Sequence, residues 1–309
     1  MQKTQFKGVF LLLLTAFIWG SSFVAQSVGM ESVEGFTFNG IRTLIGAAVL
    51  LPVILIRSAA DKKKPSEMTA EQKKAANKKL IISGSIIGVA LCVASNFQQF
   101  AFNYSSPGKI AFITAFYMFF VPLIGLFIGK RVPAVTWLCI MLGTVGLYFL
   151  CIGDEGLSGI NKGDVLTLIC AVCYAVHILL IERLAPGADS VKISCIQFLV
   201  SGAISCILMF IFETPSLTAI KACIIPLLYS GVMSCGFAYT FQIVGQKYTE
   251  STVASLLMCT ESVFGVVCSA ILVHEQLLPR EYIGCAIMFV AIVLSQFSDK
   301  IQNRFKKAK

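Results

Sequence analysis

The feature that most constrains this chain is a series of ten apolar runs, each about as long as a membrane-crossing helix. The apolar core of a bilayer is about 30 Å thick and takes about 20 helical residues to cross. The runs cover residues 8–27, 36–57, 80–102, 108–129, 133–151, 163–182, 191–212, 222–245, 250–273 and 279–297. They predict an all-α integral membrane protein with ten transmembrane helices.

Composition excludes the main soluble classes. Of the 309 residues, 57% are hydrophobic and 13% are charged, whereas a soluble domain has about 45–50% apolar and about 25% charged residues. Such a chain cannot cover a water-facing surface, which excludes a soluble enzyme, a nucleic-acid-binding module and a disordered protein. The longest loop, 58–79, has room for a short surface helix but not for a separate domain.

The 12 cysteines all fall inside apolar runs. A disulfide or zinc framework places its cysteines in loops at ligand spacing, so we interpret these as small apolar side chains. We expect no metal and no cofactor.

The distribution of basic residues predicts the orientation of the helices. With ten spans, the N-terminus, every second loop and the C-terminus share one side, which carries 20 Lys and Arg residues; the other side carries 4. Cytoplasmic segments carry the excess of Lys and Arg. We therefore expect both termini in the cytoplasm and the protein in the plasma (inner) membrane of a bacterium.

The two halves of the chain match each other at two fixed offsets. An offset of 155 aligns Trp19 with Tyr174 and residues 41–47 with 196–202, and an offset of 144 aligns Gln98 with Gln242. The two offsets differ by eleven residues, and the change from one to the other falls where the first half carries its long basic loop. We therefore predict two five-helix repeats, 1–152 and 153–309. Because five is odd, the repeats have inverted topology, which is typical of secondary transporters with a substrate site between the halves.

Several segments resemble a known family. The first span contains Ala16-x-x-Trp19-Gly20-Ser21, the fourth contains Pro122, and the ninth contains Glu261-Ser262-Val263-Phe264. In this order and spacing, the chain resembles the drug/metabolite transporter superfamily, EamA type. In that family the ninth span reads Glu-Pro-Val, so Ser262 replaces a proline here. The resemblance implies a transporter of small metabolites, often an exporter, with a central cavity.

Polar and aromatic residues recur at helical spacing inside the spans, so each set forms one stripe. Polar groups in hydrocarbon need partners or water and usually face the interior of a bundle. The candidate substrate-binding residues are Trp19, Ser22, Asn96, Gln99, Tyr117, Tyr174, His177, Tyr239, Gln242 and Glu261. Stripes of this kind also arise as hydrogen-bonded contacts between helices.

Three ionisable residues lie inside spans and have alternative interpretations. Arg42 is about 9 Å from the outer end of its helix at about 1.5 Å per residue. We interpret it as an interface residue that pairs with Glu31, Glu34 or a lipid headgroup. His177 and Glu261 lie deeper, where a structural hydrogen bond is the alternative to a role in the site.

The sequence favours a secondary transporter that moves an amino acid, amine, nucleoside or related compound across the plasma membrane by alternating access, with efflux as the expected direction. No Gly-x-x-x-x-Gly-Lys-Ser/Thr motif for ATP is present. The alternatives are an intramembrane enzyme that uses His177 and Glu261, and a membrane sensor or channel.

The expected partners are a small-molecule substrate and the lipid bilayer, with no nucleic acid. We expect a monomer or a weak homodimer, because Gly84-x-x-x-Gly88 and Gly125-x-x-x-Gly129 are interpreted as helix packing within one chain.

Overall fold

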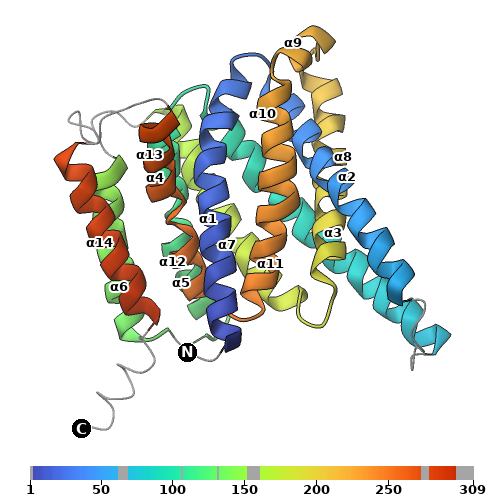
Figure 1. The fold of residues 1–309 in the computed structure, drawn as a ribbon, viewed down its shortest axis with the longest axis horizontal. Coiled ribbons are helices and arrows are strands. Elements are labelled where there is room, and N and C mark those ends of the chain that lie inside the picture. Colours follow the sequence, from blue (N-terminus) through green and yellow to red (C-terminus); the bar gives the residue numbers. More distant parts are fainter. Residues whose placement is uncertain are drawn as a thin grey trace.

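The computed structural model describes residues 3–61, 69–105, 107–130, 132–151, 161–272 and 278–296, and all regular structure in these ranges is helical (Figure 1). The helices are α1 (Lys3–Met30), α2 (Gly35–Asp61), α3 (Ala70–Ala101), α4 (Pro107–Thr114), α5 (Tyr117–Phe127), α6 (Ala134–Cys151), α7 (Lys162–Leu184), α8 (Ser190–Phe212), α9 (Leu217–Ala222), α10 (Ile224–Tyr229), the π-helix η1 (Ser230–Tyr239), α11 (Thr240–Gln246), α12 (Ser251–Met258), α13 (Glu261–Leu272) and α14 (Pro279–Gln296). Helix is therefore present in each of the ten predicted ranges.

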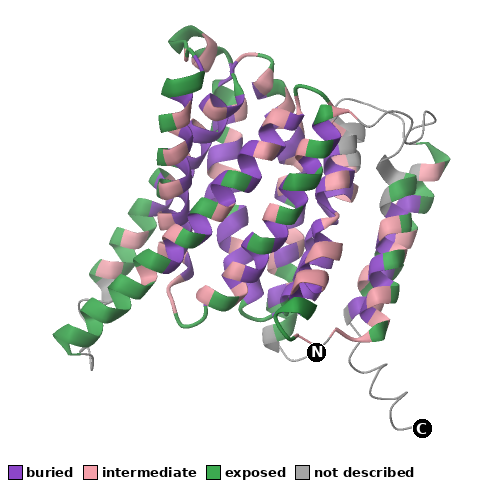
Figure 2. Ribbon diagram, turned by 180° about the vertical axis from the view of Figure 1, so that it is seen from behind, coloured by how far each residue is buried: buried purple, intermediate pink, exposed green. Residues whose placement is uncertain are grey.

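Within these ranges, seven segments are long and apolar enough to cross a membrane, and two shorter apolar helices lie in α6 and α14. The outer surface is apolar: Phe127 is 85% exposed and Phe210 is 74% exposed. The interior holds polar side chains, among them Arg42 at 3% and Glu261 at 4% exposure. Figure 2 shows the buried residues gathered in the middle of the bundle. A protein surrounded by lipid is expected to show this distribution.

Capping residues determine where α3 begins. The Thr69 side chain accepts a hydrogen bond from the backbone N–H of Gln72, and the Gln72 side chain accepts one from the backbone N–H of Thr69. This reciprocal cap starts the helix at Ala70, ten residues before the predicted apolar run. Residues 70–79 therefore extend α3 and do not form a separate surface helix.

The fourth and ninth predicted spans are each broken near the middle, which the sequence analysis did not predict. The first break separates α4 from α5, where the N–H of Phe116 donates to the carbonyl of Ile113 at 3.1 Å. The second separates α12 from α13, where the N–H of Thr260 donates to the carbonyl of Leu257 at 3.3 Å. Both are bonds to the third preceding residue, which tighten the turn. The two breaks are 144 residues apart, so they fall at equivalent positions of the halves.

The eighth predicted span is interrupted as well, because it contains η1 between α10 and α11. A Cβ atom added at Gly231 would lie 2.6 Å from the side chain of Ile45 and 2.9 Å from the carbonyl oxygen of Arg42. The glycine therefore lets η1 approach α2 closely. The π-helix is rare, and where it interrupts an α-helix it is frequently found at a functional site.

Contacts between the halves repeat with the same two offsets. A Cβ atom at Gly8 would lie 3.1 Å from the carbonyl oxygen of Gly245, and one at Gly163 would lie 3.0 Å from that of Ala101. Gly8 and Gly163 differ by 155 residues, and Ala101 and Gly245 by 144. The start of α1 thus packs on the end of α11 as the start of α7 packs on the end of α3. Consistently, α2 packs on α8 and α6 packs on α14 (Figure 1).

The two small-residue motifs behave differently. Cβ atoms at Gly84 and Gly88 would lie 2.7 Å from the Ile196 side chain and 2.8 Å from the Gln197 carbonyl oxygen, both on α8. That motif packs within the chain, as predicted. The prediction is wrong for the second motif: a Cβ atom at Gly125 would be 3.5 Å or more from its neighbours, and Gly129 has open space and a positive φ of 83°. Gly129 instead permits the turn after α5.

Candidate functional site

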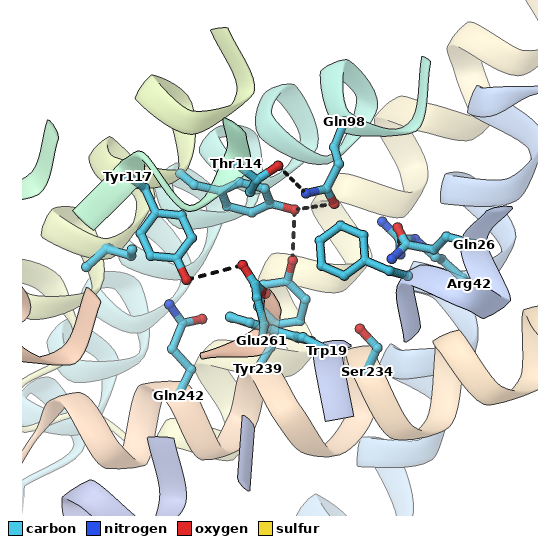
Figure 3. Close-up of a pocket in the computed structure, with 13 residues that line it drawn as sticks. Trp19, Gln26, Arg42, Gln98, Thr114, Tyr117, Ser234, Tyr239, Gln242 and Glu261 are labelled. Carbon is cyan, nitrogen blue, oxygen red and sulfur yellow. Dashed lines mark hydrogen bonds between the residues drawn. The ribbon is translucent and has the colours of Figure 1, made fainter. Parts of the chain in front are cut away.

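A cavity lies in the interior between the two halves (Figure 3). Its empty volume, including the part that is open to the outside, is about 430 Å³. The part wide enough for a water molecule is about 30 Å³, which is room for about two waters. The lining residues are Trp19, Phe23, Gln26, Arg42, Gln98, Thr114, Tyr117, Tyr174, Ile178, Ser234, Tyr239, Gln242 and Glu261. A larger ligand therefore requires side chains to move.

The cavity is built from equivalent positions of the two halves. Of its 13 lining residues, eight form four pairs related by the repeat offsets. The offset of 155 relates Trp19 to Tyr174 and Phe23 to Ile178, and the offset of 144 relates Gln98 to Gln242 and Tyr117 to Glu261. The backbone that surrounds the cavity is thus duplicated, while the side chains differ in three of the four pairs.

The two broken helices meet at the centre of the cavity. Tyr117 is the first residue of α5, Glu261 is the first residue of α13, and the Tyr117 hydroxyl donates to Glu261 Oε1 at 3.2 Å (Figure 3). The sequence-equivalent pair therefore forms a direct contact between the two halves.

A chain of hydrogen bonds forms a second part of the wall (Figure 3). The hydroxyl groups of Tyr239 and Tyr174 are 3.1 Å apart, and the Tyr174 hydroxyl donates to Gln98 Oε1 at 3.5 Å. Gln98 Nε2 donates in turn to Thr114 Oγ1 at 3.2 Å. The Trp19 ring lies against Tyr239, with 4.7 Å between ring centroids. These contacts hold three aromatic rings in fixed positions around the empty space.

Two buried polar atoms at the cavity have no protein partner among the described residues. They are Trp19 Nε1, a donor, and Gln242 Oε1, an acceptor. Buried polar atoms are normally hydrogen-bonded, and an unsatisfied one is costly. A bound molecule with both a donor and an acceptor would satisfy them.

The structure places six of the ten predicted site residues around this cavity and four outside its lining. Ser22 Oγ lies 3.5 Å from Ser230 Oγ, and Asn96 Nδ2 donates to Ser205 Oγ at 2.9 Å. The remaining two are fully buried: the Gln99 amide has no hydrogen-bond partner among the described residues, and His177 Nε2 lies 3.2 Å from the amide oxygen of Gln197 on α8. These residues share a helix stripe with lining residues but face neighbouring helices.

Seven lining residues are absent from the list of candidate substrate-binding residues: Phe23, Gln26, Arg42, Gln98, Thr114, Ile178 and Ser234. Of these, Gln26 and Thr114 lie on the polar stripes of Trp19 and Tyr117. The repeat offset of 144 carried a usable signal for Gln98, because its equivalent Gln242 was a predicted site residue and also lines the cavity. Arg42 differs most from its interpretation. It is not at an interface with Glu31 or Glu34; its Nε donates to Asn39 Oδ1 and its Nη1 to Gln26 Oε1, both at 2.7 Å.

An ion pair joins the halves at the end of the bundle where α1 begins. Lys130, which follows α5, pairs with Glu182 on α7 and donates to Ser251 Oγ at 3.1 Å. Ser251 is the first residue of α12. These contacts connect three helices at the end of the bundle and help to close it there.

Comparison with known proteins decides the family. The model of the EamA-like transporter family matches twice, at residues 6–152 and 161–297. The chain belongs to the EamA-like transporter family. This EamA chain is a multi-pass membrane protein of a transporter family, not of an enzyme family.

Two relatives of this EamA chain span nearly its whole length. An uncharacterized transporter of Archaeoglobus fulgidus is 26% identical over 288 residues, which cover 92% of this chain and 83% of that protein. A crystal structure of a protein described no further is 18% identical, with a TM-score of 0.75, and the match covers 95% of this chain and 98% of that one. The second likeness concerns the fold alone.

Proposed function

We propose that the protein is a secondary transporter that moves a small amino acid, amine, nucleoside or related metabolite across the plasma membrane by alternating access, with efflux as the expected direction. The observation that carries the proposal is the cavity between the two halves, lined by four pairs of equivalent residues. A site at the interface between two inverted repeats becomes accessible from one side of the membrane and then from the other when the repeats exchange conformations.

We also propose that the ten helical regions all cross the membrane, as two five-helix repeats of inverted topology over 1–152 and 153–309. The equivalent contacts of Gly8 and Gly163, at the starts of α1 and α7, support this arrangement. The 20 to 4 distribution of basic residues supports placing both termini in the cytoplasm.

The cavity lining supports a polar or amphipathic metabolite. It combines aromatic rings, three glutamine amides, one carboxylate and one guanidinium. The rings of Trp19, Tyr174 and Tyr239 offer apolar contact, while the unpartnered atoms of Trp19 and Gln242 offer hydrogen bonds. No ATP-binding loop of the Walker type is present in the sequence, so a solute or proton gradient would drive movement.

Counterflow in liposomes tests the proposal. Purified protein is reconstituted into vesicles loaded with a mixture of unlabelled amino acids, amines and nucleosides, and the entry of each labelled compound is measured. We expect saturable entry of at least one compound, suppressed by its unlabelled form. Entry that never exceeds that into protein-free vesicles, across the whole mixture, would refute the proposal.

A further inference from the structure

Arg42 is a buried guanidinium at the edge of the cavity. It is 3% exposed and lies on the second turn of α2. Its two hydrogen bonds go to neutral amide oxygens of Asn39 and Gln26, and its guanidinium carbon lies 5.7 Å from the centre of the Phe38 ring. In the part of the chain that the structure describes, no carboxylate forms an ion pair with it.

The amides that hold Arg42 are themselves held. Asn39 Nδ2 donates to the carbonyl of Ser95 at 2.9 Å and to Asn96 Oδ1 at 3.0 Å, so its own oxygen is turned toward Arg42. Gln26 Nε2 donates to the carbonyl of Ser22 at 3.3 Å, with the same result. Figure 3 shows Arg42 and Gln26 side by side at one part of the cavity. The guanidinium is therefore fixed in orientation without being neutralised.

A fixed, unpaired charge of this kind is costly unless something else neutralises it. Removing a cation from water is costly in a protein interior, and hydrogen bonds to neutral amides return only part of that cost. The planar fork of an arginine matches a carboxylate or a phosphate through two parallel hydrogen bonds. Nε and Nη1 are used by Asn39 and Gln26, which leaves the second terminal nitrogen and one remaining N–H of Nη1 for a ligand.

The charge is present in one half of the molecule only. At the offset of 155, the equivalent of Arg42 is Gln197, which lies outside the cavity lining and contacts His177. The carboxylate of Glu261 likewise has an uncharged equivalent, Tyr117. The first half thus contributes a guanidinium and the second half a carboxyl group, and among the described residues these two groups form no ion pair with each other.

We propose that Arg42 is an anion-binding subsite of the cavity, which takes the carboxylate or phosphate group of the transported molecule. The inference rests on the proposed transport function and narrows its substrate class. The transported molecule carries an anionic group at Arg42 and places its polar or cationic part toward Glu261 and Gln242. A neutral nucleoside or a simple amine lacks the group that Arg42 requires.

Matched sets of probes test this. For an aromatic and an aliphatic scaffold, the set is an α-amino acid, the amine that lacks its carboxylate and the acid that lacks its amino group. For a nucleoside, the set is the nucleoside and its monophosphate, which separates phosphate from carboxylate. Binding to the purified full chain is measured by thermal shift, and transport by counterflow. We expect binding only from members with an anionic group.

Variants assign the effect to Arg42. Arg42→Gln is expected to weaken binding of the anionic members by about 10- to 100-fold, the range for losing hydrogen bonds to a charged group, and Arg42→Lys to weaken it less. Arg57→Gln is the control, because Arg57 lies on the same helix but is 54% exposed by side chain and pairs with Asp189. If Arg42→Gln does not fold, Arg42→Lys still tests the proposal, because it keeps the charge and loses the fork.

Three results would overturn the subsite. In the first, a neutral or amine probe binds as tightly as its anionic counterpart. In the second, both Arg42 variants bind the anionic probes as tightly as the wild type does. In the third, no anionic probe binds. The first two leave the transport function standing when saturable counterflow is still seen. Loss of all counterflow in the wild-type protein, by contrast, would count against the transport function itself.

Discussion

The close contact between α1 and α13 beside the cavity yields a quantitative prediction. Gly20 on α1 faces the start of α13, and a Cβ atom added there would lie 2.5 Å from the carbonyl oxygen of Glu261 and 2.7 Å from the backbone nitrogen of Gly265. Across the same interface, a Cβ atom added at Gly265 would lie 3.5 Å from its nearest neighbour, the carbonyl oxygen of Gly20. One substitution therefore clashes with backbone and the other does not.

The difference between these contact distances determines how strongly each alanine substitution changes the free energy of unfolding. Ordinary contacts begin at 3.4 Å, so Gly20→Ala requires α1 and α13 to separate by about 0.9 Å. Overpacking of this kind costs about 1–3 kcal/mol. In both variants, alanine gains about 0.5–1 kcal/mol over glycine in a helix. We expect Gly265→Ala to be at least as stable as the wild type and Gly20→Ala to be about 1–3 kcal/mol less stable than Gly265→Ala.

Unfolding in mixed micelles with rising sodium dodecyl sulfate, followed by circular dichroism, measures this difference in unfolding free energy. Counterflow provides a second readout, because separation of the helices displaces Glu261 from Tyr117. If Gly20→Ala and Gly265→Ala are equally stable, or if Gly265→Ala is the weaker, then the helices do not approach as described and the reasoning fails.

Three further predictions concern the charge, the closed end and the topology. Glu261→Gln keeps the shape of the side chain and removes its carboxyl group. If Glu261 binds a cationic group, we expect the apparent KM for amine-bearing substrates in counterflow to rise about tenfold; if it exchanges protons, we expect net proton-coupled uptake to be lost while exchange persists. Normal transport in both acid and alkaline buffer would show that Glu261 has a structural role only. Lys130→Ala removes the contacts to Glu182 and Ser251, and we expect faster hydrogen exchange in α12, measured by mass spectrometry. Unchanged exchange would show that Lys130 does not hold this end of the bundle together. Reporter fusions at the C-terminus are expected to read cytoplasmic and those near residue 155 external, and an external C-terminus would exclude the proposed orientation.

The helical regions could be predicted from the sequence because hydropathy reports the length of apolar runs directly. Their interruptions could not. The breaks after Thr114 and Met258 involve a change of hydrogen-bond partner at two or three residues, with no charged residue, glycine or proline between the two helices. The π-helix at 230–239 contains Gly231, where α2 approaches closely. Local tertiary contacts, not hydropathy, determine these features.

Stripes at helical spacing located part of the candidate site. A helix in a bundle contacts neighbours on several sides, and each residue turns the side chain by about 100°. Gln98 and Gln99 show the consequence: the first lines the cavity, and the second is fully buried outside it. A stripe identifies a face that avoids lipid but does not say which interior surface it meets.

Arg42 shows why a residue's depth in a span is a poor guide to its environment. Its position near the outer end of the second span predicted an interface residue, but the rotation of the helix turns it inward, between Gln26 and Asn39. Asn39 at i−3 was a sign of a polar inner face, because i and i+3 positions are neighbours on a helix. The duplication explains part of the form of the cavity, because four pairs of equivalent positions line it. The two halves differ in their ionisable groups: Glu261 has the uncharged equivalent Tyr117 in the lining, and Arg42 has the uncharged equivalent Gln197 outside it. A symmetric scaffold thus holds an electrically asymmetric site, which is the property needed to orient a small molecule with two unlike ends.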